Sequence, residues 1–374
     1  MHVRYLAKEL VKRRHEVHIL HSLDAYRIKR KRSRDRSQLD GVHIHAVQTY
    51  FNLSSYAAYV LGNSSSVIKK FGRLVEEIKP DVVHHHNISL LGYGILRKWG
   101  DYLNLYTSHD YWLICQQNNL LKNGSEICER RSCFLCALRC GRPPQFWRHR
   151  KEFKEAVRDI DILITPSNYT KNSISRDLDL RTATIPNFVP EPADNGESSG
   201  FSNFFLYAGV LEKHKGVLNL INIYKEISGK VDAKLVIAGD GVLKHEIEEF
   251  VKRSELEGKV ILLGWVNRDS LCRLLRDATA LIVPSICPEN CPLTALEALS
   301  VGTPVITSSI GGLTEIIERI DEGLLYESQD ELKCVLMNFN RKRYASPRAI
   351  KDIYQKYYSP TAYLEKYLQL VIAC

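Results

Sequence analysis

The sequence contains no hydrophobic run long enough to cross a membrane. None of its segments approaches the ~20 consecutive apolar residues that a membrane-spanning helix needs. The amino terminus also lacks the basic cap and apolar block of a secretory signal peptide, and opens with a charged segment whose apolar residues recur at helical spacing. We therefore expect a cytoplasmic protein.

Acidic residues are too few to balance the basic ones, which leaves a formal net charge of +9. The densest basic run extends from Arg27 to Arg36 and contains no aromatic residue, so it does not provide the stacking that single-stranded nucleic acids use. It suits anionic lipid headgroups or a phosphorylated acceptor; the alternatives are a nuclear signal, a nucleic-acid patch or a solvated loop. We expect peripheral contact with the inner face of the membrane, and no nucleic-acid partner.

A disulfide-stabilised secreted scaffold is disfavoured too, although the chain has ten cysteines, because it is long and has no signal peptide. Two short-spaced pairs of cysteines suit a tetrahedral, structural zinc ion, and nearby basic residues favour thiolates. Free or disulfide-linked thiols and an iron–sulfur cluster are the alternatives. The four residues are Cys128, Cys133, Cys136 and Cys140.

The 374 residues suffice for two domains, and 44% hydrophobic and 25% charged residues are ordinary for a globular protein. In both halves β-rich apolar runs alternate with helical patterns, which predicts parallel sheets covered by helices. Residues 191–200 have linker composition. We therefore predict an α/β protein with one Rossmann-like domain over 1–190, including a Cys-rich insertion at 115–142, and another over 200–355. Strands are expected at 204–210, 233–239, 260–266, 280–284 and 303–308.

The chain starts inside a helix, whereas such folds normally begin with a strand and a tight turn. We therefore expect the N-terminal sheet to lack its first strand. A wrongly chosen start codon would explain this, and mass spectrometry of the native protein that identified Met1 as its true N-terminus would refute that explanation.

The segment 284–304 carries the strongest chemical signal. A strand ends near Pro284, and a helix begins near Leu293, with Pro292 suited to its first turn. Free N–H groups and the helix dipole at that start suit a diphosphate, at the strand end where doubly wound sheets bind ligands. Glu289 in the loop and Glu297 in the helix could accept hydrogen bonds from ribose and sugar hydroxyls. The alternative is an ordinary loop glutamate and an exposed helix glutamate.

These residues resemble those of the retaining family 4 glycosyltransferases of GT-B architecture. Glu289 and Glu297 match the E-x7-E signature, flanked by V-P-S, P-L-T-A-L-E-A-L and G-T-P-V-I as in the family. G-D-G at 239–241, L-G-W-V at 263–266 and G-G at 311–312 extend the resemblance over almost the whole C-terminal half. D-V-V-H-H-H at 81–86 and T-S-H-D at 107–110 are similar to N-terminal motifs of the family.

The resemblance implies a role for each matching residue. Glu297 would bind the ribose hydroxyls and Glu289 the donor sugar. Backbone amides at Cys291, Leu293 and Thr294 would hold the diphosphate.

Further roles come from two other motifs. His109 would reach the donor sugar across an interdomain cleft. In the diphosphate loop G-R-L-x-x-E-K-G, Gly209 and Lys215 match, but Val210 stands where arginine is usual and His214 where glutamate is usual. One expected cation is therefore missing, and such a lost contact can cost a few kcal/mol, for which Lys213 or His214 could compensate. The glycine-rich N-terminal loop of the family has no counterpart.

The resemblance implies two Rossmann-like domains facing each other across a cleft, with residues 356–374 forming a helix that crosses back to the first domain. It also implies retaining hexosyl transfer from a nucleoside-diphosphate sugar to a carbohydrate or lipid-linked acceptor, in cell-envelope polysaccharide, glycolipid or glycan synthesis. No cofactor would be required for catalysis, so any zinc would be structural. The alternatives are a truncated, non-catalytic sugar-nucleotide-binding protein and a sugar-nucleotide epimerase of the same fold.

Overall fold

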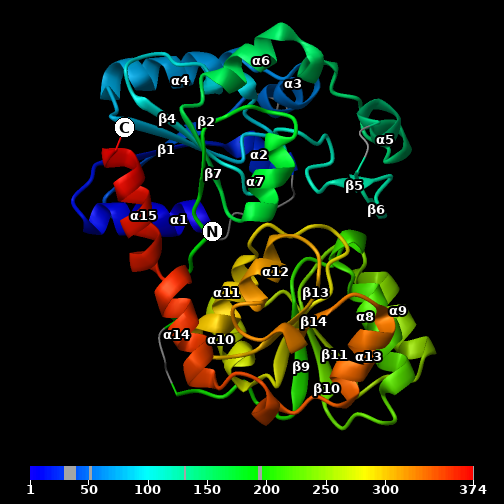
Figure 1. Cartoon of the computed structure of the whole chain (residues 1–374). Helices are drawn as coiled ribbons and strands as arrows, with labels where there is room; N and C mark the ends of the chain where they lie inside the picture. The colour runs from blue at the N-terminus through cyan, green and yellow to red at the C-terminus, as the bar shows by residue number, and fades with distance from the viewer. Residues whose placement is uncertain (29–38, 50–52, 130–131, 193–195, 374) are drawn as a thin grey trace. The chain divides into compact units, whose positions relative to one another are not determined.

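The computed structural model describes residues 1–28, 39–49, 53–129, 132–192 and 196–373, so most of the basic run lies outside the described residues. The chain forms two compact units, each an α/β structure with parallel strands, which confirms the predicted fold class (Figure 1). The first unit comprises Met1–Asn123, Cys128–Ile185 and Lys366–Cys374, and the second comprises Gly124–Ile127 and Pro186–Glu365. No helix among the described residues is both long enough and apolar enough to span a membrane.

The second unit contains a six-stranded parallel sheet in the order β11-β10-β9-β12-β13-β14. Its central strands are almost fully buried, which explains why they appear in the sequence as short, nearly continuous apolar runs. Each of the five predicted strands is found, with ends that differ by at most two residues. The strands are β9 (Phe204–Ala208), β10 (Lys234–Ala238), β11 (Val260–Gly264), β12 (Ala280–Val283), β13 (Val305–Ser308) and β14 (Leu325–Tyr326).

The helices of this unit follow the strands in alternation. Helix α14 packs against α11, so the compact unit extends beyond residue 355 to Glu365. The helices are α8 (Val217–Ile227), α9 (Lys244–Arg253), α10 (Arg268–Asp277), α11 (Leu293–Ser300), α12 (Gly312–Ile317), α13 (Gln329–Met337) and α14 (Pro347–Tyr358), with 3-10 turns η4 (Lys213–Lys215), η5 (Glu322–Leu324) and η6 (Arg341–Arg343).

The order of the strands positions the candidate site. Strand β9 lies between β10 and β12, so the chain first builds the sheet outward to β11 and then returns to add β12 on the other side of β9. Ligands of doubly wound sheets bind at such a switch point, outside the carboxyl ends of the strands. The loops that follow β9 and β12 are therefore the expected place for a ligand in this unit.

The first unit contains two parallel sheets, β1-β2 and β3-β4-β7-β8. No strand within the described residues joins them, as expected for a sheet without its first strand. The strands are β1 (Val17–Ser22), β2 (Val42–Val47), β3 (Val82–His86), β4 (Leu103–Thr107), β7 (Ile162–Thr165) and β8 (Thr182–Thr184).

Helices and most of the Cys-rich insertion complete the first unit, and the last residues of the chain, Lys366–Cys374, cluster with it, whereas Gly124–Ile127 of the insertion cluster with the second unit. The helices are α1 (His2–Lys12), α2 (Leu23–Ile28), α3 (Leu53–Leu61), α4 (Ser65–Ile78), α6 (Lys151–Arg158) and α7 (Asn168–Ser175), with 3-10 turns η2 (Tyr93–Leu96) and η3 (Phe146–His149). Helix α15 (Pro360–Ile372) begins in the second unit and ends in the first. The insertion contains the short strands β5 (Leu121–Lys122) and β6 (Glu126–Ile127) and helix α5 (Cys133–Arg139).

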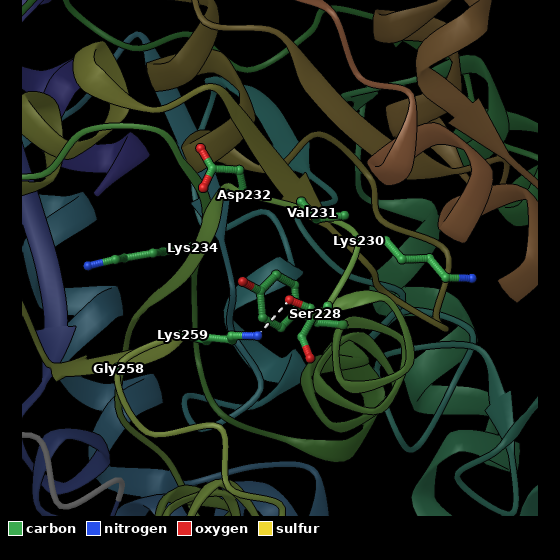
Figure 2. A pocket seen from close by; sticks show the side chains of 9 residues that line it. Ser228, Lys230, Val231, Asp232, Lys234, Gly258 and Lys259 are labelled. Carbon is green, nitrogen blue, oxygen red and sulfur yellow. Dashed lines mark hydrogen bonds between the residues drawn. The ribbon is translucent and has the colours of Figure 1, made fainter.

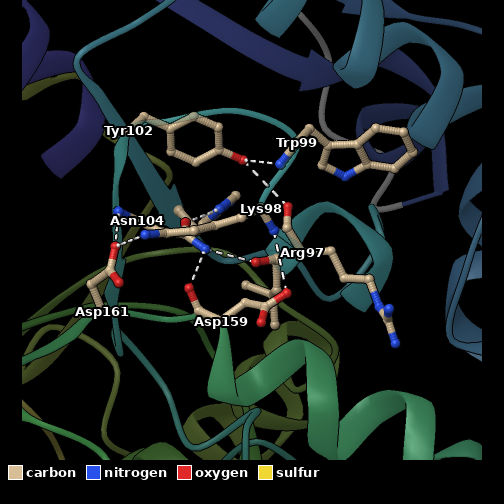
Figure 3. A network of polar contacts seen from close by, with 9 residues as sticks. Arg97, Lys98, Trp99, Tyr102, Asn104, Asp159 and Asp161 are labelled. Carbon is tan, nitrogen blue, oxygen red and sulfur yellow. Dashed lines mark hydrogen bonds and ion pairs between the residues drawn. The ribbon is translucent and has the colours of Figure 1, made fainter.

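A buried asparagine on β4 connects three segments of this unit (Figure 3). Asn104 is fully buried, and its Nδ2 donates to the carbonyl oxygens of Leu96 at 2.7 Å and Asp159 at 2.8 Å. Its Oδ1 lies 2.9 Å from Nε2 of the buried His85, and its backbone N–H donates to Asp161. Every polar atom of this side chain is thus paired inside the unit.

Replacing Asn104 by alanine is expected to destabilise the first unit by about 3 kcal/mol, because two carbonyl oxygens and an imidazole nitrogen would be left without their partner. Chemical denaturation measures the change. The matched control is Asn222→Ala on the exposed face of α8, where the amide donates only to the Leu218 carbonyl of its own helix. Equal effects of the two variants would contradict the structural role of Asn104.

Candidate functional site

The loops after β9 and β12 meet in an ion pair. Lys215 Nζ lies 2.7 Å from Glu289 Oε1, and Ser285 Oγ donates to the same oxygen at 2.6 Å. The Glu289 side chain is 13% exposed and that of Lys215 is 29% exposed. Two residues predicted from separate motifs are therefore in direct contact at the switch point of the sheet.

The ion pair keeps Lys215 charged. Burial disfavours the ammonium ion, but the adjacent Glu289 carboxylate outweighs it and raises the pKa of Lys215 above its ordinary value. A cation held in this way can take a phosphate oxygen as a further acceptor, because an ammonium group has three N–H donors.

Glycines allow the loops to approach one another. Gly216 ends the 3-10 turn of Lys215 with φ +70°, and a Cβ on it would lie 1.8 Å from the Pro284 carbonyl oxygen. A Cβ on Gly239, after β10, would lie 1.9 Å from the oxygen of Gly209, after β9. Only glycine fits at these places, so the glycines matched to the family motifs hold the backbones together.

Helix α11 begins directly after the Glu289 loop. Its first residue is Leu293, and no side chain caps its start, so the amides of Leu293 and Thr294 point outward from an uncapped helix end. Asn187 Nδ2 donates to the Cys291 carbonyl at 2.9 Å and fixes the turn that precedes the helix. The structure thus places Cys291, Leu293 and Thr294 at a helix start suited to an anion.

The thiol of Cys291 is not suited to bind a ligand as a thiolate. Cys291 and its neighbour Cys287 are each 4% exposed. Burial raises the pKa of both thiols to about 12, so both stay protonated near neutral pH. The predicted contact of Cys291 with a diphosphate therefore involves its backbone.

Glu297 lies further along α11 with a 12% exposed side chain, not on an exposed helix face. Burial raises the pKa of its carboxyl, and Arg268 counteracts this shift from 3.8 Å, Nε to Oε1. Arg268 also donates to the Pro190 carbonyl at 3.0 Å. The sequence did not point to Arg268, which no motif marks. Ser285 belongs to the V-P-S motif, but its contact with Glu289 follows from the fold.

His109 lies in the first unit, in the turn after β4, where its Nε2 lies 2.9 Å from His86 Nδ1. The neighbouring His84 bonds to Thr107 at 2.7 Å and to the Tyr367 hydroxyl at 3.2 Å. Burial lowers the pKa of His109 to about 4, so its imidazole is neutral at pH 7 and suited to hydrogen-bond a hydroxyl.

The histidine group around His109 also includes His2, whose ring centroid lies 4.9 Å from that of His109. His2, at the start of α1, and Tyr367, on α15, were not predicted. The D-V-V-H-H-H motif contains His84 and His86 and the T-S-H-D motif contains His109, but nothing in the local sequence marks His2 or Tyr367.

The Cys-rich insertion does not show the geometry of a tetrahedral zinc site. Within the described part of the chain, no three of the four predicted sulfur atoms lie within 4.8 Å of one another. Cys136 Sγ accepts a hydrogen bond from the Asn123 amide at 3.3 Å. A shared metal ion would need the loop to rearrange, so structural zinc stays a prediction, which metal analysis of the purified chain tests.

A surface hollow in the second unit is lined by Lys230, Lys234 and Lys259, and Figure 2 shows Lys259 Nζ bonded to the Ser228 carbonyl at 2.8 Å. Most of its residues lie directly before β10 and β11 or at the first residue of β10, so it lies at the amino ends of these strands. The candidate residues lie at the carboxyl ends, and the hollow is not part of their site.

Family models match both parts of the chain. The model described as Glycosyltransferase Family 4 matches residues 1–191, and the model described as Glycosyl transferases group 1 matches residues 193–336.

A curated relative, an uncharacterized glycosyltransferase from Methanocaldococcus jannaschii, is 36% identical over 158 residues, which are 41% of this chain and 40% of the relative. The chain spans about half the length of the curated relatives that it matches.

Two solved structures share the fold along their length. Sucrose-phosphate synthase from Thermosynechococcus elongatus superposes with a TM-score of 0.70 at 18% identity, covering 100% of this chain and 93% of that one. HepE from Anabaena in complex with UDP and glucose gives a TM-score of 0.67 at 14% identity, covering 100% and 95%.

Proposed function

This chain belongs to Glycosyltransferase Family 4, and on that premise we propose that it moves a hexosyl group from a nucleoside-diphosphate sugar to a hydroxyl acceptor with retention of configuration. The observation that carries the proposal is the Lys215–Glu289 pair at the switch point of the second sheet, beside the uncapped start of α11. This arrangement offers a cation and backbone amides for a diphosphate and carboxylates for hydroxyls. UDP bound in the HepE structure supports a donor of this class.

Each group has one role in this proposal. Lys215 and the amides at Cys291, Leu293 and Thr294 bind the diphosphate. Glu297 accepts hydrogen bonds from the ribose hydroxyls, and Glu289 holds the donor sugar and positions it for transfer. His109, neutral at pH 7, contributes a hydrogen bond to the donor sugar.

The reaction breaks the bond between the anomeric carbon and the diphosphate oxygen and forms a bond to the acceptor oxygen on the same face of the sugar. The proton of the acceptor hydroxyl passes to the leaving phosphate. No separate general base is needed, which agrees with the absence of a nucleophile–base pair among the described candidate residues. Lys215 stabilises the charge that develops on the leaving group.

The acceptor is proposed to be a carbohydrate or lipid-linked hydroxyl of cell-envelope polysaccharide, glycolipid or glycan synthesis. A cytoplasmic enzyme in peripheral contact with the inner membrane face fits the net charge of +9.

The test is a screen of UDP- and GDP-sugars by calorimetry, followed by NMR of the product anomer with the donor that binds. The expected result is micromolar to millimolar binding and a product with the donor's anomeric configuration. Inverted configuration, or no binding of any nucleotide sugar, would overturn the proposal.

One observation favours a non-catalytic sugar-nucleotide-binding protein as second candidate. Val210 stands where the family has arginine, and the residue is 48% exposed, so one cation of the diphosphate loop is replaced by an apolar group. Binding of a donor without transfer or hydrolysis would support this candidate.

Replacing Arg268 by glutamine is expected to weaken nucleotide binding about tenfold at pH 6, with a smaller loss at pH 8. Without the guanidinium the pKa of Glu297 would rise further, and a protonated carboxyl accepts hydrogen bonds from ribose less well. Calorimetry with UDP and 2′,3′-dideoxy-UDP from pH 5.5 to 8 measures this.

The control for that experiment is Arg253→Gln, an exposed residue at the end of α9. If the Arg268 variant bound both nucleotides with the same pH dependence as the parent, Arg268 would not act through Glu297.

A further inference from the structure

Three potential metal ligands meet at the amino end of the β1-β2 sheet in the first unit. A carboxylate oxygen of Glu16 and one ring nitrogen each of His18 and His43 all lie within 4.8 Å of one another. We propose that Glu16, His18 and His43 bind a divalent transition-metal ion of the zinc type.

The strand register brings the two histidines together. β1 and β2 are parallel, and His18 pairs with His43, so both side chains stand on the same face of the sheet. Their rings are stacked, with centroids 4.6 Å apart and an angle of 21° between the planes. The position of these two ligands is thus fixed by backbone pairing.

Glu16 directly precedes β1 and supplies the third ligand. Its Oε1 lies 2.9 Å from His18 Nε2. Two ligand atoms about 2.1 Å from a tetrahedral zinc ion lie about 3.4 Å apart, so a small opening of this contact admits the ion. The Glu16 side chain is 73% exposed and free to make that movement.

A fourth residue supports the arrangement without being a ligand. His45 Nε2 lies 2.9 Å from His18 Nδ1, and the two rings are stacked with an angle of 8° between them. Ligating histidines ordinarily donate their second ring N–H to an acceptor, which fixes the tautomer and the ring orientation, and a His45 ring nitrogen can serve as that acceptor here. Without a metal ion, Nε2–H of His18 donates to Glu16, and binding of the ion to Nε2 would move the proton to Nδ1, which can then donate to His45.

The donor set selects the class of ion. Two imidazoles and one carboxylate suit zinc, nickel and cobalt better than calcium or magnesium, which prefer oxygen ligands alone. Three protein ligands leave a coordination position for water. An ion here would connect the segment before β1 to β2, and a two-stranded sheet gains from such a connection because it has few backbone bonds of its own.

The experiment titrates the metal-free full-length chain with Zn²⁺ and with Co²⁺ and compares His43→Gln and Glu16→Gln with the parent. We expect each variant to bind this ion at least tenfold more weakly, or to bind one equivalent fewer. The matched control is His245→Gln on α9, where an exposed histidine lies 3.4 Å from Glu249 without a third ligand, and it should bind as the parent does.

Cobalt spectra separate this site from the cysteines of the insertion. Cobalt bound by nitrogen and oxygen lacks the intense thiolate charge-transfer band that cobalt bound by cysteine shows. We expect the equivalent lost in His43→Gln to be the one without that band. Unchanged affinity and stoichiometry in His43→Gln, with circular dichroism matching the parent, would overturn the proposal.

Discussion

Replacing Lys215 by alanine is expected to lower kcat/KM for the donor by a factor of about 10² to 10³, with a marked loss of UDP or GDP affinity. The ammonium group is the cation that the structure places at the switch point of the second sheet, 2.7 Å from Glu289. Loss of one donor to a developing negative charge costs about this much in other enzymes. Val210 supplies no second cation in the same loop, so compensation from that position is not available.

The control and the second variant separate binding from folding. Lys213→Ala removes an exposed lysine from the same 3-10 turn and should leave kcat/KM within about twofold of the parent. Lys215→Ala also leaves the Glu289 carboxylate buried without its partner, which can cost ~3–5 kcal/mol of stability. The double variant Lys215→Met/Glu289→Gln removes both charges and should recover stability but not activity. Full turnover in Lys215→Ala would exclude Lys215 from the diphosphate site.

The strands of the second unit could be predicted from the sequence because a parallel sheet is buried on both faces. The run Ala280–Val283 is apolar throughout for that reason, and the turn after it contains proline. Strand β14 has only two residues, Leu325 and Tyr326, and no apolar run that could reveal it. Its strand geometry depends on hydrogen bonds to β13, so it follows from the packing of the rest of the chain.

The candidate site also contains residues that the sequence predicted and partners that it did not. Lys215, Glu289 and Glu297 were predicted because each lies in a local motif whose residues are close in the chain. Their partners were not, since the contact of Arg268 with Glu297 depends on how α10 and α11 pack.

The spacing of the four cysteines predicted soft ligands but not the distances between their sulfur atoms, which depend on the path of the backbone between them. The metal ligands proposed at β1 and β2 were not predicted, because no short sequence motif contains all three. His43 is far from Glu16 and His18 in the sequence, and only the strand register places it beside them.

The first unit is expected to lose most of its stability as the pH falls from 7 to 4.5. Burial lowers the pKa of His85 to about 4, although its bond to Asn104 opposes the shift, and burial lowers the pKa of His109 to about 4 as well. The unfolded chain takes up these protons near pH 6.5, so it binds more protons than the folded chain between pH 6.5 and 4. Stability is therefore full above 6.5 and is lost as the pH falls toward 4.

The expected loss of unfolding free energy is large for a domain. A shift of this extent is worth on the order of 3 kcal/mol for each of the two histidines, and burial lowers the pKa of His2, His84 and His86 in the same direction. The total approaches the ~5–15 kcal/mol that stabilises an ordinary domain. Acid should therefore unfold the first unit at a pH at which exposed histidines alone would have no such effect.

Tryptophan fluorescence can follow this unit by itself, since three of the four tryptophans, Trp99, Trp112 and Trp147, belong to it. In a Trp265→Phe background, denaturant titrations from pH 8 to 4.5 should show the unfolding free energy falling below pH 6.5. Adding His85→Gln should reduce the slope by about one proton, ~1.4 kcal/mol per pH unit, even if the variant is less stable at pH 7. His245→Gln should leave the slope unchanged because that side chain is 84% exposed. A flat profile in the parent between pH 7 and 4.5 would mean that these histidines are protonated without cost in the folded unit.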